Sequence, residues 1–299
     1  MEKIITIGIP KGSLEESTLS LFSKAGFAFS GSGRSLWLTS NDPELKPVLL
    51  RPQEIPVYVA NGSLDCGLAG LDWITENNCN ERVKILADLC YSKQTFRKIK
   101  WVLAVANDSP YKTVDDLKKL VAPPLRVSTE LIAITGNWLA ERGIFADVSF
   151  SWGATEAKVP VFADAIVDAT ETGTSLRENG LRIVDTLFES TTQFFANRDF
   201  YKQDDWKRTK LDGIALLLKS CLAAATKVSI HVHVPAAVDL EQIQAQIPAS
   251  GYFSVWEGKE KERLLEIIVD NTKARDLIPA LARCGAKKIS VQPLSMLYE

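Results

Sequence analysis

A hydroxyl-rich turn between an apolar stretch and a helix start is the strongest chemical signal in the sequence. It covers residues 168–175 and reads Asp-Ala-Thr-Glu-Thr-Gly-Thr-Ser. The preceding residues 165–168 predict a strand that ends in an acid, and ligands of α/β sheets bind beyond the carboxyl ends of strands. A helix N-terminus offers free amides and the positive end of its dipole, which suits a phosphate group. We interpret 168–175 as a phosphate-binding loop.

The side chains of this turn have different expected tasks. Gly173 lets the main chain approach a ligand closely. Three hydroxyl groups can donate to a phosphate: Thr172, Thr174 and Ser175. Asp168 and Glu171 would repel a phosphate, so they better suit ribose hydroxyls or a Mg²⁺ ion carried by the ligand. The alternative interpretation of the same residues is a capped strand-to-helix turn without a ligand.

Three further stretches follow predicted strands. Lys11 and Gly12 lie between a strand expected at 4–10 and a helix, which makes a second phosphate-compatible corner. Arg51 ends a strand expected at 46–50 and could grip a phosphate with two hydrogen bonds. Residues 151–158 end another strand and begin a helix. Taken alone, the first corner also fits a structural turn, and Arg51 also fits a surface ion pair.

Composition excludes several classes of function. The chain has 299 residues and a net charge of -2, with 35 basic and 37 acidic residues, so we expect no nucleic-acid partner. Five cysteines without a CxxC motif argue against a disulfide framework and for a reducing, cytoplasmic location. No apolar run is long enough to span a membrane. His231 and His233 share one face of a predicted strand with no third ligand nearby, so we expect no metal site there.

Strand-like and helix-like stretches alternate through the first two thirds of the chain, which predicts α/β lobes with mostly parallel sheets. Two capping boxes are expected, at 13–16 and 113–116. The tail reads strand, helix, strand, strand, helix, strand, the ferredoxin-like order. We predict four parts: lobe I from 1–91 with 182–203, lobe II from 92–181, a connecting helix at 204–225, and a βαββαβ domain at 226–299.

The four stretches, in this order, resemble long-form ATP phosphoribosyltransferase, the first enzyme of histidine biosynthesis. Residues 168–176, with Asn-Gly-Leu at 179–181, are similar to the family's PRPP-binding signature. The corner at 10–12, the block 51–72 and the turn 153–156 also fit. The tail is similar to the histidine-binding regulatory domain of the long form. The resemblance covers essentially the whole chain.

The resemblance implies a two-lobed, periplasmic-binding-protein-like catalytic body and a C-terminal regulatory domain. It implies an Mg²⁺-dependent glycosyltransferase that joins PRPP to N1 of ATP, is inhibited by histidine and forms homodimers or hexamers. The implied catalytic residues are Lys11, Arg51, Glu156 and Asp168. The implied PRPP contacts are Asp168, Thr170, Glu171, Thr172, Gly173, Thr174 and Ser175. The implied ATP contacts are Lys11, Gly12, Asp72 and Glu156, and the implied histidine contacts are Gly285 and Ala286.

Three other interpretations stay open at the level of sequence. Two α/β lobes with two crossovers also describe small-molecule binding proteins. A phosphoribosyltransferase for another base is a second alternative, although its PRPP loop usually has two adjacent acids, whereas Asp168 is followed by Ala169. A purely regulatory amino-acid sensor built on the tail is a third, and the intact loop argues against it.

Overall fold

The computed structural model describes residues 3–31, 35–91, 98–258 and 262–298. The chain divides into two compact units, Met1–Ala215 and Leu216–Glu299. The division lies inside helix α8 (Asp205–Ala224) rather than at the predicted border of 225 and 226. Within the described ranges no helix, α8 included, has the length and apolar content to cross a bilayer.

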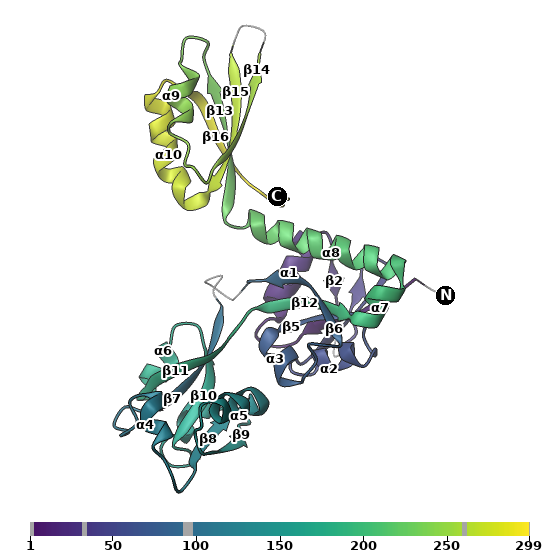
Figure 1. Ribbon diagram of the computed structural model, residues 1–299. Coiled ribbons are helices and arrows are strands. Elements are labelled where there is room, and N and C mark those ends of the chain that lie inside the picture. Colours follow the sequence, from purple (N-terminus) through teal and green to yellow (C-terminus); the bar gives the residue numbers. More distant parts are fainter. Residues whose placement is uncertain (1–2, 32–34, 92–97, 259–261, 299) are drawn as a thin grey trace. The chain divides into compact units, whose positions relative to one another are not determined.

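Lobe I of the first unit is built on a five-stranded mixed sheet (Figure 1). In sheet order its strands are β4 (Leu45–Leu50), β1 (Ile5–Pro10), β5 (Cys66–Gly70), β12 (Thr192–Asn197) and β6 (Val83–Leu89). The first three are mutually parallel, and β12 is antiparallel to both of its neighbours. Ile5, Ile7 and Ile9 of β1 are fully buried, and because alternate residues of a strand share one face, they form a buried apolar face of the sheet.

Short helices and a two-stranded ribbon complete lobe I. They are α1 (Glu15–Lys24), α2 (Ile55–Ala60), α3 (Leu71–Glu76), α7 (Arg198–Gln203) and the ribbon of β2 (Phe29–Ser30) and β3 (Thr39–Ser40). The capping box predicted at 13–16 does not form. Leu14 is the N-cap without a side-chain bond, and the Glu15 carboxylate accepts the Gly12 amide instead, at 3.2 Å.

Lobe II is built on a second five-stranded mixed sheet. In sheet order its strands are β11 (Leu181–Ser190), β7 (Ile99–Ala106), β10 (Ala165–Thr170), β8 (Leu125–Thr129) and β9 (Ala146–Phe150). The last three are parallel, and β7 is antiparallel to both neighbours. Its helices are α4 (Val114–Lys118), α5 (Ile132–Glu141), α6 (Thr174–Glu178) and the 3₁₀ turn η1 (Thr155–Lys158). The predicted capping box at 113–116 is present.

The chain passes between the lobes twice, which gives the predicted two-lobed, periplasmic-binding-protein-like body. The first passage joins β6 to β7, and the predicted border of 91 and 92 there adjoins residues 92–97, which lie outside the described ranges. The second joins β11 to β12 through Thr191 alone. Strand β11 pairs with β7 of lobe II, whereas the sequence placed it in lobe I from residue 182. Because the two strands follow each other without a turn, nothing in the composition marks the passage.

The second unit has the predicted element order: β13 (Lys227–Val234), α9 (Leu240–Gln244), β14 (Tyr252–Glu257), β15 (Arg263–Asp270), α10 (Asn271–Arg283) and β16 (Lys287–Pro293). Its sheet is antiparallel with the order β14-β15-β13-β16, as in a ferredoxin-like domain. Ile230 and Ile267 of the central strands pack with Leu277 and Leu281 of α10 in one core. This arrangement confirms the predicted α/β fold class with an appended C-terminal domain.

Candidate active site

The three parallel strands of lobe II end side by side. In the register, Val167 of β10 pairs with Thr129 of β8, and Thr129 pairs with Phe150 of β9. The next residues, Asp168, Glu130 and Ser151, therefore come together at one edge of the sheet. Strand β10 continues two residues beyond the predicted end, to Thr170, but residues 168–170 pair only with β7. One side of this segment is thus left open to a ligand.

The parallel strands of lobe I end in the same way. Strand β1 is followed by Lys11, β4 by Arg51, and β5 by α3, which carries Asp72 in its first turn. The residues that the sequence singled out in lobe I therefore all follow the carboxyl ends of parallel strands. This shared edge is the place where open α/β sheets bind ligands.

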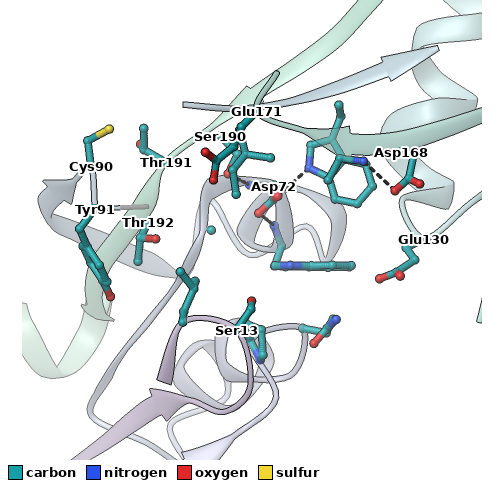
Figure 2. A pocket seen from close by; sticks show the side chains of 18 residues that line it. Ser13, Asp72, Cys90, Tyr91, Glu130, Asp168, Glu171, Ser190, Thr191 and Thr192 are labelled. Carbon is teal, nitrogen blue, oxygen red and sulfur yellow. Dashed lines mark hydrogen bonds between the residues drawn. The ribbon is translucent and has the colours of Figure 1, made fainter. Parts of the chain in front are cut away.

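A cavity of about 400 Å³ lies between the strand ends of the two lobes (Figure 2). Both passages between the lobes contribute to its wall, through Cys90, Tyr91 and residues 190–192. Four carboxylates also line it: Asp72, Glu130, Asp168 and Glu171. Within the described part of the chain, no lysine, arginine or histidine lines this cavity. The cavity is therefore acidic and suits hydroxyls, a cation or a positively charged ring more than a bare phosphate.

Asp168 is a half-buried carboxylate with a perturbed acidity. Burial, with the nearby charges of Glu156 and Glu130, raises its pKa to about 6, against a counteracting hydrogen bond from the Ala169 amide at 2.8 Å. The group therefore changes its charge close to neutral pH. Figure 2 shows its carboxylate at the cavity, next to Glu130.

Asp72 is buried and saturated with hydrogen bonds. One oxygen accepts the indole N–H of Trp101 at 2.7 Å, and the other accepts the Trp73 amide at 2.8 Å. Burial raises the pKa of Asp72 and these hydrogen bonds lower it, with a net rise. Trp101 belongs to β7, so this contact joins the two lobes. A residue predicted to contact ATP thus lies at the cavity wall as an inter-lobe link.

The predicted phosphate loop is held by its own side chains. The Gly173 amide donates to Thr170 Oγ1 at 2.7 Å, and Gly173 has a φ of 73°, in the left-handed region that favours glycine. The Thr172 and Thr174 hydroxyls are 3.0 Å apart. Arg177 donates to the Thr172 carbonyl and to the Thr174 hydroxyl. The loop is thus preformed, with hydroxyls and a guanidinium together.

Glu156 contacts this loop from the turn after β9. Its Oε1 accepts the Ser175 hydroxyl at 2.8 Å, so two stretches predicted separately are brought together. Lys158, two residues later, donates to Ser151 Oγ at 2.6 Å and to Ser128 Oγ at 3.3 Å. The loop is therefore braced by the neighbouring strand end.

A second cavity of about 610 Å³ adjoins the first. Arg51 lines it, together with Trp152, which is 93% exposed, and with Phe150, whose ring lies 4.8 Å from that of Trp152. Gln53, Trp73 and Glu130 line both cavities. Both cavities have aromatic walls, but among the described residues only the second is lined by a cation, Arg51.

The remaining predicted residues lie elsewhere. Lys11 and Gly12 are exposed and are not part of either cavity wall, although Ser13 lines the first. Gly285 and Ala286 belong to the second unit, at the end of α10, where Gly285 has a φ of 93° and Ala286 is buried. Among the described residues no three carboxylate, histidine or cysteine side chains are grouped to hold a metal ion.

The cavity residues that sequence reasoning missed include Glu130, Trp73 and Trp101. Glu130 follows the end of β8, so the strand-end rule that selected Asp168 would also have selected it. Trp101 and Trp73 meet edge-to-face with ring centroids 6.1 Å apart. Trp101 lies inside a strand, and its partner is in the other lobe, so no local pattern marks it.

Comparisons with known proteins agree with this geometry. Residues 51–220 match the family described as ATP phosphoribosyltransferase (HisG). The chain is 44% identical over 295 residues to the ATP phosphoribosyltransferase of Thermodesulfovibrio yellowstonii, covering 98% of each chain. It is 45% identical to that of Pelotomaculum thermopropionicum, covering 97% of this chain and 98% of the relative.

A solved ATP phosphoribosyl transferase complex (HisG:HisZ) from Thermotoga maritima shares the fold. Its TM-score is 0.59 at 22% identity, over 72% of this chain and 99% of the solved one. Taken with the whole-length relatives above, this likeness leaves one assignment. The chain belongs to the ATP phosphoribosyltransferase family.

Proposed function

We propose that this chain transfers the phosphoribosyl group of PRPP to N1 of ATP and releases pyrophosphate, the first step of histidine biosynthesis. The observation that carries the proposal is the preformed loop at 170–175 beside Asp168 and the acidic cavity. Family membership supports the same reaction. Both substrates are cytoplasmic metabolites, which is the location we expect.

We assign the 5′-phosphate of PRPP to the loop. The hydroxyls of residues 172, 174 and 175 and the first amides of α6 supply donors, and Arg177 supplies a positive charge. The ribose hydroxyls are assigned to Asp168 or Glu171, which line the acidic cavity. Carboxylates accept hydrogen bonds from hydroxyls and repel phosphate, so this division follows from charge.

The polyphosphates are assigned to the cations at the ends of the lobe I strands. Arg51 lines the second cavity and is placed for ATP, whereas Lys11 would reach pyrophosphate or ATP from the exposed corner before Ser13. Glu156 acts on the loop through Ser175 and is a candidate contact for the adenosine side. Asp72 is assigned to the wall that ATP packs against, because its oxygens are already occupied.

A divalent metal ion fits this site, and Mg²⁺ is the ion we propose. Four carboxylates line the first cavity without a cation among the described residues, so a polyphosphate would be repelled without a counter-ion. Because no ready-made metal cluster is present in the described ranges, the ion would arrive with the phosphates and be approached by Asp168 or Glu171. When bound, Mg²⁺ neutralises charge that develops on the leaving pyrophosphate.

Most of the catalysis is positioning and charge stabilisation. Displacement at the anomeric carbon passes through an oxocarbenium-like state, so no covalent nucleophile is needed. The loop and cavity hold the two substrates in line. One well-aimed donor contributes about 3 kcal/mol to lowering the barrier.

The test is turnover of ATP and PRPP by wild type, Asp168→Asn and Thr172→Ala, followed by ultraviolet absorbance. We expect both variants to lose about 10²-fold in kcat/KM, because each removes a group that orients the sugar phosphate. Ser63→Ala, in a loop of lobe I outside both cavities, is the control. Unchanged turnover in both loop variants would refute the loop assignment.

We further propose feedback inhibition by histidine through the C-terminal unit, coupled to a dimer–hexamer equilibrium. Such coupling requires two states with different affinity for histidine. The unit has its own core and could carry a separate site, for which Gly285 and Ala286 are candidates. Histidine should lower turnover of the full chain and change its mass in light scattering. Equal turnover and mass with and without histidine would refute this part.

A further inference from the structure

We propose that Glu130 is a further catalytic residue, whose carboxylate stabilises the positive charge that adenine acquires when its N1 attacks PRPP. The inference rests on the proposed function and goes beyond it, because it names the group that faces the reacting base. It follows from where Glu130 lies, from its lack of a partner, and from the charge balance of the reaction.

The position of Glu130, at the junction of the two cavities, is the first observation that supports the inference. The first cavity holds the sugar-side groups, Asp168 and Glu171, and the second holds Arg51 and the exposed ring of Trp152. A bond between two substrates must form where their cavities meet. Among the described residues, that junction is formed by Gln53, Trp73 and Glu130. Glu130 is the only charged member of this group.

Glu130 is available to a ligand. It is half-buried, and among the described residues no hydrogen bond or ion pair reaches its carboxylate. Figure 2 shows it beside Asp168 at the cavity, with no dashed contact. Withdrawing an ionised group from water costs free energy unless a partner restores the lost interactions. A positively charged ligand group would supply that partner.

The loop that carries Glu130 is held rigidly. The Leu131 amide donates to Thr129 Oγ1 at 3.0 Å. The amides of Ala133 and Ile134, at the start of α5, donate to Glu76 of lobe I at 2.8 and 3.0 Å. The main chain that carries Glu130 is therefore held in place by hydrogen bonds, which favours a preorganised catalytic group.

The reaction places a positive charge at this junction. The N1 lone pair forms the N1–C1′ bond, and the C1′–O bond breaks with its electrons leaving on pyrophosphate. The adenine ring is then cationic, and the charge is shared with its 6-amino group. That group donates a hydrogen bond to Glu130 and passes its proton to the carboxylate as the neutral product forms. The proton then leaves to solvent, so charge and atoms balance.

Trp73 supports the same placement. Its indole lines both cavities, and an aromatic face attracts a flat cation. Glu130 also acts on Asp168, since its charge helps to raise the Asp168 pKa. The two carboxylates therefore line the same part of the first cavity.

The experiment compares three variants of the full chain with wild type at pH 8, where Asp168 is ionised in all of them. Glu130→Gln keeps the shape and removes the charge, Glu130→Asp keeps the charge, and Glu141→Gln removes an exposed charge from the other end of α5. We expect Glu130→Gln to lower kcat by about 10²–10³-fold, with both KM values within about threefold of wild type. Glu130→Asp should retain more activity than Glu130→Gln, and Glu141→Gln should match wild type.

Chemical rescue separates a catalytic from a structural role. Glu130→Ala leaves room for a small carboxylate, so added formate should raise its kcat, while leaving Glu141→Gln unchanged. A merely structural role would give no rescue. Melting temperatures show whether each variant is folded. If Glu130→Gln does not fold, Glu130→Asp is compared with wild type instead.

Three results would overturn the inference. The first is a kcat for Glu130→Gln within threefold of wild type. The second is a loss that excess Mg²⁺ restores, which would make Glu130 a metal ligand. The third is a rise in KM for ATP alone, which would make it a binding contact. Wild type that is inactive with ATP and PRPP would instead overturn the proposed function, and this inference with it.

Discussion

Two aspartates lie at the carboxyl edge of a parallel sheet region, one in each lobe, and both line the same cavity. Asp72 follows β5, and Asp168 is the first residue of β10 beyond its pairing with β8. Burial raises the pKa of each. Asp72 is 4% exposed and holds hydrogen bonds to an indole and an amide. Asp168 is half-buried and holds one hydrogen bond, from the next amide. The same residue type at the same topological place is thus saturated in one lobe and open to a ligand in the other.

Helix α3 explains the difference, because it links the lobes at both ends. Asp72 in its first turn accepts from Trp101 of lobe II, and Glu76 in its last turn accepts two amides of α5. Helix α5 has no side-chain cap of its own, so Glu76 supplies the cap from the other lobe. Asp72 therefore stabilises the cavity wall through α3, whereas Asp168, at an open strand edge, is available to contact a ligand.

The largest expected effect on stability comes from removing the hydrogen bond between Asp72 and the Trp101 indole. Asp72→Ala removes the acceptor of the buried Trp101 indole, and leaving such a donor unpaired costs about 1–3 kcal/mol beyond the lost packing. We expect the free energy of unfolding to fall by about 2–4 kcal/mol in urea titrations at pH 7. Asp72→Asn keeps an acceptor and should cost less.

A substitution at Gly70 gives an independent check of the position of the Asp72 carboxylate. A Cβ at residue 70 would lie 2.0 Å from Asp72 Oδ1, so Gly70→Ala should displace the carboxylate. Residues that share a contact show non-additive effects. The cost of Gly70→Ala should therefore shrink in the Asp72→Ala background, and equal costs in both backgrounds would contradict the contact.

Removing the charge of Asp168 should change the free energy of unfolding in the opposite direction. An acid with a pKa of about 6 when folded and 3.8 when unfolded binds its proton more tightly in the folded state. Its contribution to stability is therefore favourable at low pH and is lost as the pH rises from 3.8 to about 6. Asp168→Asn removes this loss, so the free energy of unfolding should rise by about 1–3 kcal/mol at pH 7 while turnover falls.

The pH dependence tests this explanation. Urea titrations of wild type and Asp168→Asn should converge as the pH falls well below 3.8, where the carboxyl is protonated in both states. Glu178→Gln, at the exposed end of α6, removes a charge outside the cavity and should follow wild type throughout. A constant difference between Asp168→Asn and wild type from pH 4 to 7 would show that charge is not the cause.

Glu76 should have a smaller effect, of about 1 kcal/mol, because a helix cap contributes on that scale. Glu76→Gln keeps an oxygen for one of the two amides, and Glu76→Ala keeps none. We expect unfolding free energies in the order wild type, Gln, Ala. Because α5 follows the Glu130 loop, kcat should fall in the same order. Equal kcat values in all three proteins would show that the Glu76 cap does not affect the cavity.

The sequence predicted those parts of the site that depend on local pattern. Asp168, Arg51 and Lys11 were found because each comes directly after the apolar residues of a strand. The Asp72–Trp101 bond was not found, since it joins residues 29 apart in different lobes. Local pattern also failed at the predicted capping box of residues 13–16: Leu14 rather than Ser13 is the N-cap, and Glu15 accepts the amide of Gly12, whose φ is 103°.

The smallest expected effect concerns the acidity of Asp168. The charge of Glu156 helps to raise the Asp168 pKa, so Glu156→Gln should lower it by less than about one unit. The glutamine keeps an oxygen for the Ser175 hydroxyl, so the loop contact survives. Ionised Asp168 is the form that accepts ribose hydroxyls, so kcat/KM should rise with pH through about 6 in wild type and through a lower pH in the variant. A rise at the same pH in both proteins would mean that burial sets the pKa of Asp168 and that the charge of Glu156 does not contribute to it.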